Sequence, residues 1–252
     1  MYFDTHAHYD DEAYGDDLPE LIDAMREIGI SYILNPAVDM ESSEKIIALS
    51  DEYDILYGAV GFHPSDCDKF ESDSLDRLSS LAENKKILAI GEIGLDYYWT
   101  RENSELQRSV FTKQLELAFD LGLPVVVHSR DAHEETLEIL SRFRGIRGAL
   151  HCYSGSAEFA ERLRKLDFYF GFDGPVTYKN ARKTLEALAS VPKNRILIET
   201  DSPYLSPTPH RGERNSSLNL PLISAKCAEI LNMPERDFSK LTLMNGKELF
   251  GI

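Results

Sequence analysis

The sequence predicts an α/β fold of the (β/α)8, or TIM-type, barrel, formed as a single domain over residues 1–252. Eight short apolar runs, rich in β-branched and aromatic residues, are separated by amphipathic stretches with helical spacing. Such alternation is typical of βα units around a parallel sheet. Several runs are continuously apolar, as expected for strands that are covered on both faces. Barrels of this kind commonly have about 250 residues, and a doubly wound open sheet is the alternative.

The expected strands are separated by loops and helices, and the longest irregular segment follows the last strand. In chain order, the strands are expected at residues 2–8, 31–37, 55–63, 87–94, 124–129, 147–153, 167–172 and 195–201. The irregular segment covers residues 202–217, and its prolines argue against a helix. In a barrel, this segment would lie over the C-terminal mouth, where the loops after the strands form active sites.

The helical stretches carry their own start and stop signals. In the longest one, Ser104 and Gln107 match a capping box. Gly122 matches a left-handed C-terminal cap, after which Pro124 prevents continuation. The apolar face of this helix is expected from Phe111, Leu115, Ala118 and Leu121. Shorter helices of the same kind are expected within residues 74–84, 133–143 and 157–166.

Composition and charge narrow the class of function. The formal net charge is −16, so the surface offers no long-range attraction to nucleic acid or to an anionic membrane. A phosphate-bearing substrate must then be held by metal ions or by a few arginines. The three cysteines are widely spaced and indicate reduced thiols. Without a signal-peptide pattern or an apolar run of about 18–20 residues, a cytoplasmic protein with no membrane contact is expected. No stable protein partner is expected, and a monomer is the default.

Histidines and acids gather at the ends of the expected strands. The histidines concerned are His6, His8, His63, His128 and His151. Glu92 and Asp201 occupy equivalent places. Any one of these histidines alone is best explained as a packed core residue. Five histidines and two acids at one barrel mouth are much harder to explain by packing, because buried ionised carboxylates are costly unless they are paired or metal-bound.

These side chains have the chemistry of metal ligands. Imidazole and carboxylate groups without cysteine suit Zn, Mn, Fe, Ni or Co, with Mg at a more oxygen-rich position. The candidate ligands are more numerous than those that one open catalytic zinc usually takes from a protein. We therefore expect two adjacent divalent cations, which share a carboxylate, lower the pKa of a water molecule and orient its attack.

Seven short motifs together resemble one known family. They are "FDTHAH", "GFHP", "GEIGLDYY", "HSRDA", "HCYSG", "ETDSPYL" and "PHRGERN", and they occur in the order found in the TatD family. The resemblance runs from Asp4 to at least Asn215, and "NGKELFG" near the end fits as well. It implies a metal-dependent hydrolase of the amidohydrolase superfamily, built on a (β/α)8 barrel.

The resemblance implies a role for each candidate ligand. His6 and His8 match the ligands of one metal, and His128 and His151 match ligands of the second. Glu92 matches the carboxylate that bridges both metals, in place of the modified lysine used elsewhere in the superfamily. The remaining ligand, Asp201, matches the acid after the last strand, which binds the first metal and acts as general base toward the water.

Further residues are candidates for contact with the substrate. His63 resembles a contact to the substrate or transition state, with stabilisation of a turn as the alternative. Arg130 would face the same mouth and clamp a phosphate, or else pair with a carboxylate. Tyr153 and Arg211 either touch the substrate or serve in packing and surface pairing. The catalytic candidates are thus Asp201, Glu92 and His63.

Two neighbours of the predicted ligands are expected to have structural roles only. Cys152 should point away from the face that carries His151 and pack in the core. His133 should begin a helix and lie in solvent at the surface. Neither residue is therefore counted in the predicted site.

The resemblance implies hydrolysis of phosphodiester bonds, with DNA or a related phosphodiester as the substrate. An end-acting deoxyribonuclease is expected, because a barrel mouth is a pocket and the surface is acidic. One alternative keeps the site but changes the bond to a carboxylic ester or an amide, as in deacylation of D-aminoacyl-tRNA. Another is a metal-binding protein without catalysis. One departure from the family pattern bears on substrate binding: Glu213 stands where a lysine is more frequent, which removes positive charge near the proposed mouth.

Overall fold

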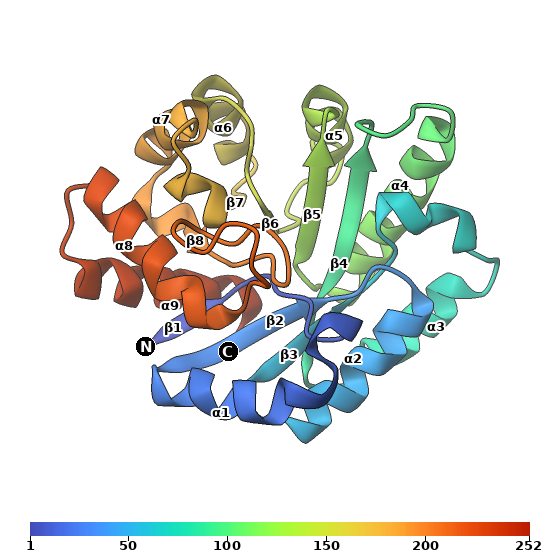
Figure 1. Cartoon of the computed structure of the whole chain (residues 1–252). Coiled ribbons are helices and arrows are strands. Elements are labelled where there is room, and N and C mark those ends of the chain that lie inside the picture. The colour runs from blue at the N-terminus through green and yellow to red at the C-terminus, as the bar shows by residue number, and fades with distance from the viewer.

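The computed structural model describes all 252 residues and confirms the predicted (β/α)8 barrel. Eight parallel strands follow in sequential order, and helices surround them (Figure 1). The strands are β1 (Tyr2–Asp4), β2 (Ile30–Pro36), β3 (Leu56–Val60), β4 (Ile87–Asp96), β5 (Val125–Arg130), β6 (Gly148–Leu150), β7 (Tyr169–Phe172) and β8 (Ile196–Ile198). The α-helices are α1 (Leu18–Glu27), α2 (Met40–Glu52), α3 (Ser74–Leu81), α4 (Ser104–Leu121), α5 (His133–Leu140), α6 (Ala157–Arg164), α7 (Arg182–Ser190), α8 (Leu220–Ile230) and α9 (Glu235–Phe250).

The barrel closes where the segments after β1 and β8 meet. The backbone N–H of Asp201 donates to the carbonyl of His6 at 2.9 Å, and Ala7 and Ser202 form a parallel bridge. The N-terminal segment is therefore fixed on both sides, to β2 and to the end of β8, and it places His6 and His8 inside the mouth.

Most strands end earlier than expected, so that the site residues lie just beyond them. β1 ends at Asp4 and β8 at Ile198. Positive φ angles at Cys152 (42°) and Asp201 (54°) turn the chain out of the sheet after β6 and β8. β4 differs, because it continues to Asp96, two residues past the expected end.

The longest helix, α4, ends as expected but begins differently. Gly122 has the predicted left-handed conformation, with φ 68°. The predicted capping box is wrong, because Ser104 is the first helical residue and no side chain caps this end. The amide of Gln107 instead accepts from the backbone N–H of Asp96 and donates to its carbonyl, both at 2.9 Å. Leu121 is also exposed rather than part of the buried face.

An apolar layer fills the barrel beneath the mouth. One buried cluster takes a side chain from every strand and closes against α9: Phe3, Leu34, Ala59, Leu88, Ala89, Val126, Ala149, Tyr169, Leu197, Leu243, Leu249 and Phe250. Val126, Ala149 and Leu197 stand two residues before His128, His151 and Glu199, on the same strand face. The packed layer therefore fixes the height at which the site residues lie.

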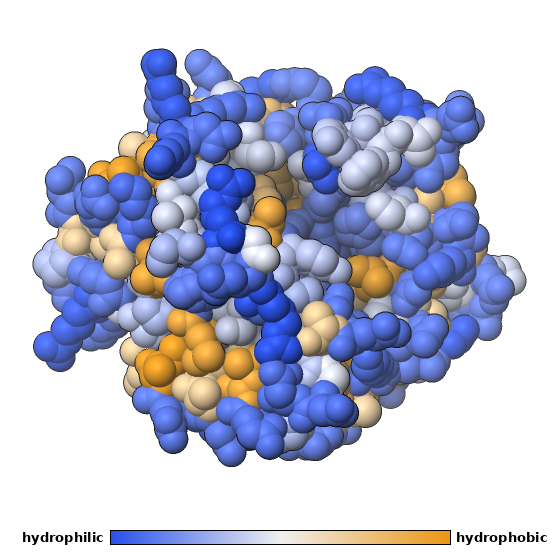
Figure 2. Space-filling model, in the orientation of Figure 1, coloured by the Kyte–Doolittle hydropathy of each residue, from blue (hydrophilic) through white to orange (hydrophobic).

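The outer surface seen in Figure 2 is mostly hydrophilic, with apolar side chains in a few separate groups. No helix combines the length and the apolar character needed to cross a membrane.

Candidate metal centre

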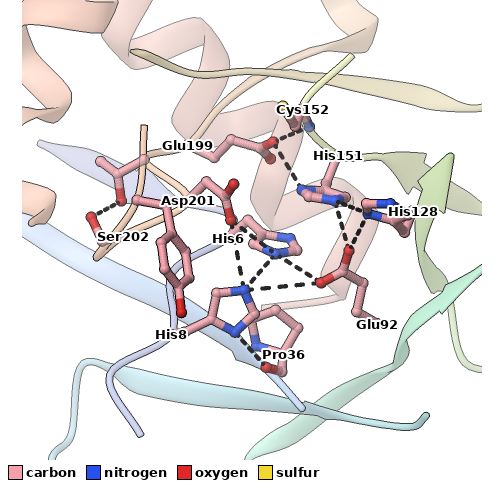
Figure 3. A network of polar contacts seen from close by, with 12 residues as sticks. His6, His8, Pro36, Glu92, His128, His151, Cys152, Glu199, Asp201 and Ser202 are labelled. Atoms are coloured by element: carbon pink, nitrogen blue, oxygen red, sulfur yellow. Dashed lines mark hydrogen bonds and ion pairs between the residues drawn. The ribbon is translucent and has the colours of Figure 1, made fainter. Parts of the chain in front are cut away.

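The predicted metal ligands converge at the C-terminal end of the barrel. They are His6, His8, Glu92, His128, His151 and Asp201, and Figure 3 shows their side chains pointing toward one another. They come from five positions around the barrel: the segment after β1, strands β4 and β5, and the segments after β6 and β8.

Glu92 lies between two groups of histidines. Its Oε1 atom is 2.7 Å from His151 Nε2 and 2.9 Å from His128 Nδ1. Its Oε2 atom is 3.3 Å from His6 Nε2 and 3.9 Å from His8 Nε2. One carboxylate thus presents a separate oxygen to each group, which is the arrangement that a bridging ligand requires.

The first group contains His6, His8 and Asp201. Asp201 Oδ1 lies 3.7 Å from His6 Nε2 and 3.6 Å from His8 Nε2. His8 Nδ1 lies 3.1 Å from the carbonyl of Pro36, which can only accept, so this nitrogen carries a hydrogen. A neutral His8 therefore directs the lone pair of Nε2 toward His6 and Asp201.

The second group contains His128 and His151, with His63 beside them. His128 Nδ1 is 3.0 Å from His151 Nε2, and the ring of His63 packs edge-on against that of His128, with centroids 4.5 Å apart. The backbone N–H of Ser65 donates to His63 Nδ1, so a neutral His63 carries its hydrogen on Nε2. That tautomer makes His63 a hydrogen-bond donor toward the cavity rather than a ligand.

Burial and mutual charge set the protonation of the histidines. Burial and the neighbouring His151 lower the pKa of His6 to about 4. Burial also lowers the pKa of His63 to about 3. Burial alone would lower the pKa of His8 as well, but Asp201, Glu92 and Asp10 outweigh it and raise the value to about 9. In the ligand-free protein, a proton on His8 therefore supplies the positive charge that faces these carboxylates.

Neighbouring charges also set the protonation of His128 and of the two acids, Glu92 and Asp201. His128 is buried between two carboxylates, Asp96 and Glu92, which overcome burial and raise its pKa to about 9. Burial alone would raise the pKa of Glu92, but the surrounding histidines hold it well below its ordinary value. The pKa of Asp201 is lowered for the same reason. Both acids are thus ionised and available as ligands.

The geometry fits a divalent cation in each group. His6 Nε2 and His8 Nε2 are 3.2 Å apart, and the pair formed by His128 and His151 is 3.0 Å apart. The raised pKa values of His8 and His128 mean that a proton lies within each pair in the ligand-free protein, and a cation that displaces this proton would face a neutral nitrogen from each ring. Imidazole and carboxylate are donors that Zn, Mn, Fe, Ni and Co accept.

Asp96 is a member of this site that the sequence reasoning missed. Its Oδ2 atom lies 3.1 Å from His128 Nε2, and the side chain is 5 % exposed. Glu92, Gly94 and Asp96 are two residues apart and so lie on one face of β4. A longer expected strand would therefore have placed Asp96 beside Glu92. Gly94 is required there, because a Cβ atom at its φ of 148° would lie 2.0 Å from the carbonyl oxygen of His128.

A cavity of about 620 Å³ opens over the metal-centre residues. Its walls are formed by His8, Asp10, Asp11, Val38, His63, Ser65, Glu92, Asp96, Trp99, His128, Arg130, His151, Asp201 and Tyr204. Arg130 reaches this cavity as predicted, and its guanidinium carbon lies 3.7 Å from the centre of the Tyr98 ring. It is the only lysine or arginine in the wall.

Two predicted substrate contacts do not reach the cavity wall. Tyr153 is 3 % exposed, and its hydroxyl donates to the carbonyl of Ser156 at 2.7 Å, while its ring packs against Phe170. Arg211 is exposed in the loop after β8, with its guanidinium carbon 4.1 Å from the centre of the Tyr178 ring. Packing explains Tyr153, and surface stacking explains Arg211.

Cys152 and His133 both differ from expectation. Cys152 does not pack in the apolar core, because its sulfur lies within 4.8 Å of carboxylate oxygens of Asp173 and Asp201. The left-handed turn at Cys152 places it there. His133 begins α5 as expected, but it is half-buried, with its ring stacked on Phe159 at 5.2 Å between centroids.

The comparisons with known proteins agree with this geometry. The family model described as "TatD related DNase" matches residues 3–251. The chain belongs to the TatD family. A TatD-family relative from Bacillus subtilis, the "uncharacterized metal-dependent hydrolase YabD", is 38% identical over 254 residues, covering 100% of both chains. The Escherichia coli relative YjjV, described in the same words, is 32% identical, covering 100% of this chain and 98% of its own.

Solved structures of the TatD family agree as well. The crystal structure of E. coli YjjV has a TM-score of 0.94 and 31% identity, covering 100% of this chain and 98% of the other. A TatD-family hydrolase from Entamoeba histolytica has a TM-score of 0.90, covers 99% and 98% of the two chains, and supports the fold alone at 21% identity. The protein is therefore a metal-dependent hydrolase of the TatD family with a (β/α)8 barrel.

Proposed function

We propose that this protein is an end-acting deoxyribonuclease that hydrolyses phosphodiester bonds with the help of two divalent cations. The position of Glu92 carries the proposal. One of its oxygens faces His128 and His151, and the other faces His6 and His8, at distances between 2.7 and 3.9 Å. A carboxylate so placed suits two cations that share it.

The residues around Glu92 have complementary tasks. Bound cations would lower the pKa of a water molecule and neutralise charge on the substrate phosphate. Asp201 accepts the proton from the attacking water, because its lowered pKa keeps the carboxylate ionised. His63 donates a hydrogen bond from Nε2 to a phosphate oxygen, because Ser65 occupies its Nδ1 atom and burial keeps the ring neutral.

The mouth suits the end of a chain better than a long duplex. The cavity of about 620 Å³ accommodates a nucleotide or two, and Arg130 is its only basic side chain besides the histidines. The net charge of −16 opposes extended contact with a polyanion. Glu213, in the loop after β8, is exposed, and its carboxylate lies 2.9 Å from His210 Nδ1. An acidic side chain at this position adds no positive charge for a phosphate to contact.

The acidity of the cavity favours a second candidate, hydrolysis of a carboxylic ester or an amide such as that in D-aminoacyl-tRNA. Five carboxylates line the cavity, from Asp10, Asp11, Glu92, Asp96 and Asp201, against one guanidinium. A substrate whose scissile bond carries no negative charge would enter such a cavity more easily than a phosphodiester. The same water, activated in the same place, attacks either centre.

A panel of substrates tests the proposal. The protein, freed of metal and reloaded with Zn, Mn, Mg, Ni or Co, is assayed against single-stranded DNA, nucleotide esters and D-aminoacyl-tRNA. We expect release of nucleotides from the ends of single-stranded DNA, and we expect Asp201→Asn to slow it by about 10²–10⁴-fold. Turnover of D-aminoacyl-tRNA alone would establish the second candidate. Turnover that is unchanged in Asp201→Asn would refute the assigned mechanism.

A further inference from the structure

The cavity wall contains a strongly exposed aromatic side chain, Trp99. Trp99, in the segment between β4 and α4, is 75% exposed and lines the cavity. It is the only tryptophan in the chain. Large aromatic rings bury the most apolar area of any side chain, so an exposed indole beside a catalytic site has surface available for a ligand.

The indole belongs to a small stack that also holds Arg130. The rings of Trp99 and Tyr98 meet edge to face, with centroids 4.8 Å apart. The guanidinium carbon of Arg130 lies 3.7 Å from the centre of the Tyr98 ring and 5.7 Å from that of Trp99. The only lysine or arginine of the cavity wall and its most exposed ring are therefore neighbours, held together through Tyr98.

Charge alone does not hold a nucleic acid in this cavity. The five carboxylates of the wall outweigh Arg130, and two divalent cations would only bring the sum of these charges to zero. Affinity for a substrate must then come from contacts at short range. Stacking on an aromatic ring is such a contact, and it tolerates any sequence because every base has a π face.

We propose that Trp99 stacks on an unpaired nucleobase of the substrate, while Arg130 contacts the phosphate next to that base. This rests on the proposed function and narrows its substrate class to nucleic acid with a single-stranded end. A base inside a duplex is already stacked and paired, so its face is not free for Trp99.

Tyr204 is the competing position for a base. It also lines the cavity, is 55% exposed and lies beside His8, with ring centroids 6.5 Å apart. Its hydroxyl is fixed by Asp11 Oδ2 at 2.9 Å. Its contacts are thus with His8 and Asp11, whereas Trp99 stacks with Tyr98 beside Arg130, so a test must separate the two rings.

Two ligands that differ only in the base provide the test. Deoxyadenosine monophosphate and 2-deoxyribose 5-phosphate share sugar and phosphate, and each is titrated into metal-loaded protein. Tryptophan emission, excited where the 12 tyrosines absorb little, reports on Trp99 alone. We expect deoxyadenosine monophosphate to quench it and 2-deoxyribose 5-phosphate to leave it unchanged.

Calorimetry on variants then assigns the binding energy. Trp99→Leu should bind deoxyadenosine monophosphate about tenfold more weakly, with affinity for 2-deoxyribose 5-phosphate unchanged. Trp99→Phe should retain most of the affinity. Phe119→Leu is the matched control, because Phe119 is 54% exposed on α4 but outside the cavity wall, and it should bind both ligands as the wild type does.

Three results would overturn the proposal: equal binding by Trp99→Leu and wild type, an equal loss for both ligands, or a base-dependent loss in Tyr204→Leu alone. The proposed function is measured separately, as release of nucleotides from single-stranded DNA. Base-dependent binding without any cleavage of DNA would sink the proposed function and leave stacking on Trp99 standing. Cleavage without base-dependent binding would do the reverse.

Discussion

Two sets of buried carboxylates lie close together in the barrel and differ in what faces them. Glu92 and Asp201, the histidine-facing carboxylates, have lowered pKa values because imidazole rings outweigh the cost of burial. Asp4 and Glu199, the hydroxyl-facing carboxylates, have raised pKa values because burial dominates: the pKa of Asp4 rises to about 6 and that of Glu199 well above its usual range. Burial therefore does not by itself set the charge, and the neighbours decide which acids can hold a cation.

The hydroxyl-facing carboxylates serve as structural acceptors. Asp4 accepts from the backbone N–H of Thr200 at 3.0 Å and from the hydroxyls of Thr200 and Ser217 at 2.6 Å each. Glu199 accepts from the hydroxyl of Thr5 at 3.2 Å and from the N–H of Cys152 at 2.5 Å. These bonds connect β1, β8 and the loop before α8 beneath the candidate metal centre.

The largest effect is expected from a substitution in the histidine-facing carboxylates. Glu92→Gln removes the charge that both histidine groups share, so we expect turnover to fall by at least about a thousandfold. Calorimetric titration with Zn should show weaker binding in the same variant. Glu199→Gln is the matched control. Glu199 Oε1 lies 3.8 Å from His151 Nδ1, beyond hydrogen-bonding distance, so its loss should lower turnover by no more than about 10–100-fold. Equal losses in the two variants would remove the distinction between the sets.

The second prediction concerns a substitution in the hydroxyl-facing carboxylates. Asp4→Ala leaves the N–H and hydroxyl of Thr200 and the hydroxyl of Ser217 without their acceptor. Each buried unsatisfied group costs about 1–3 kcal/mol, so we expect the free energy of unfolding to fall by about 3 kcal/mol or more, measured with urea. Asp4→Asn keeps one acceptor oxygen and should lose clearly less. An identical loss in Asn and Ala variants would show that packing, rather than hydrogen bonding, is what Asp4 supplies.

Metal binding should sharpen the comparison further. A cation that binds only the folded state stabilises it by about 2.7 kcal/mol at a concentration 100 times its Kd. Wild-type protein should therefore show a higher Tm with Zn than with a chelator. Glu92→Gln should lose most of this increase, while Glu199→Gln should keep it. An increase that persists in Glu92→Gln would place the cation elsewhere on the protein.

The barrel and the convergence of the predicted ligands followed from sequence because both depend on local regularities. Short apolar runs, several of them continuous, and helical stretches of period 3.6 are visible in a single chain. Histidines at strand ends meet at one edge because parallel strands share a direction. His6, Glu92 and Asp201 were therefore found without knowledge of any distance.

The missed features depend on where strands end and how the chain turns. Asp96 was missed because β4 continues two residues beyond the expected end. Cys152 was misplaced because a left-handed residue breaks the alternation of β6. The substrate contacts were the least predictable: Tyr153 and Arg130 both follow a histidine by two residues, yet one is buried against Phe170 and the other reaches the cavity. Packing across the barrel, rather than local pattern, separates them.

A carboxylate outside the barrel gives the smallest effect and a reference for both sets. Asp39 caps α2, with Oδ1 2.9 Å from the N–H of Ser42 and Oδ2 2.7 Å from Lys69 Nζ. Burial alone would raise its pKa, but Lys69 and Ser42 hold the pKa below its ordinary value. A folded pKa below the unfolded one stabilises the protein above pH of about 4, and this is lost as pH falls through the folded pKa. Asp39→Ala should thus lower the free energy of unfolding by about 1 kcal/mol at pH near 7 and by less near pH 3, as measured by urea unfolding at both pH values.

Asp39→Asn retains an acceptor without charge, so it should lose less stability than Asp39→Ala at the higher pH. A cost of Asp39→Ala that does not change with pH would assign the stabilisation to the cap alone, and charge would then matter only inside the barrel.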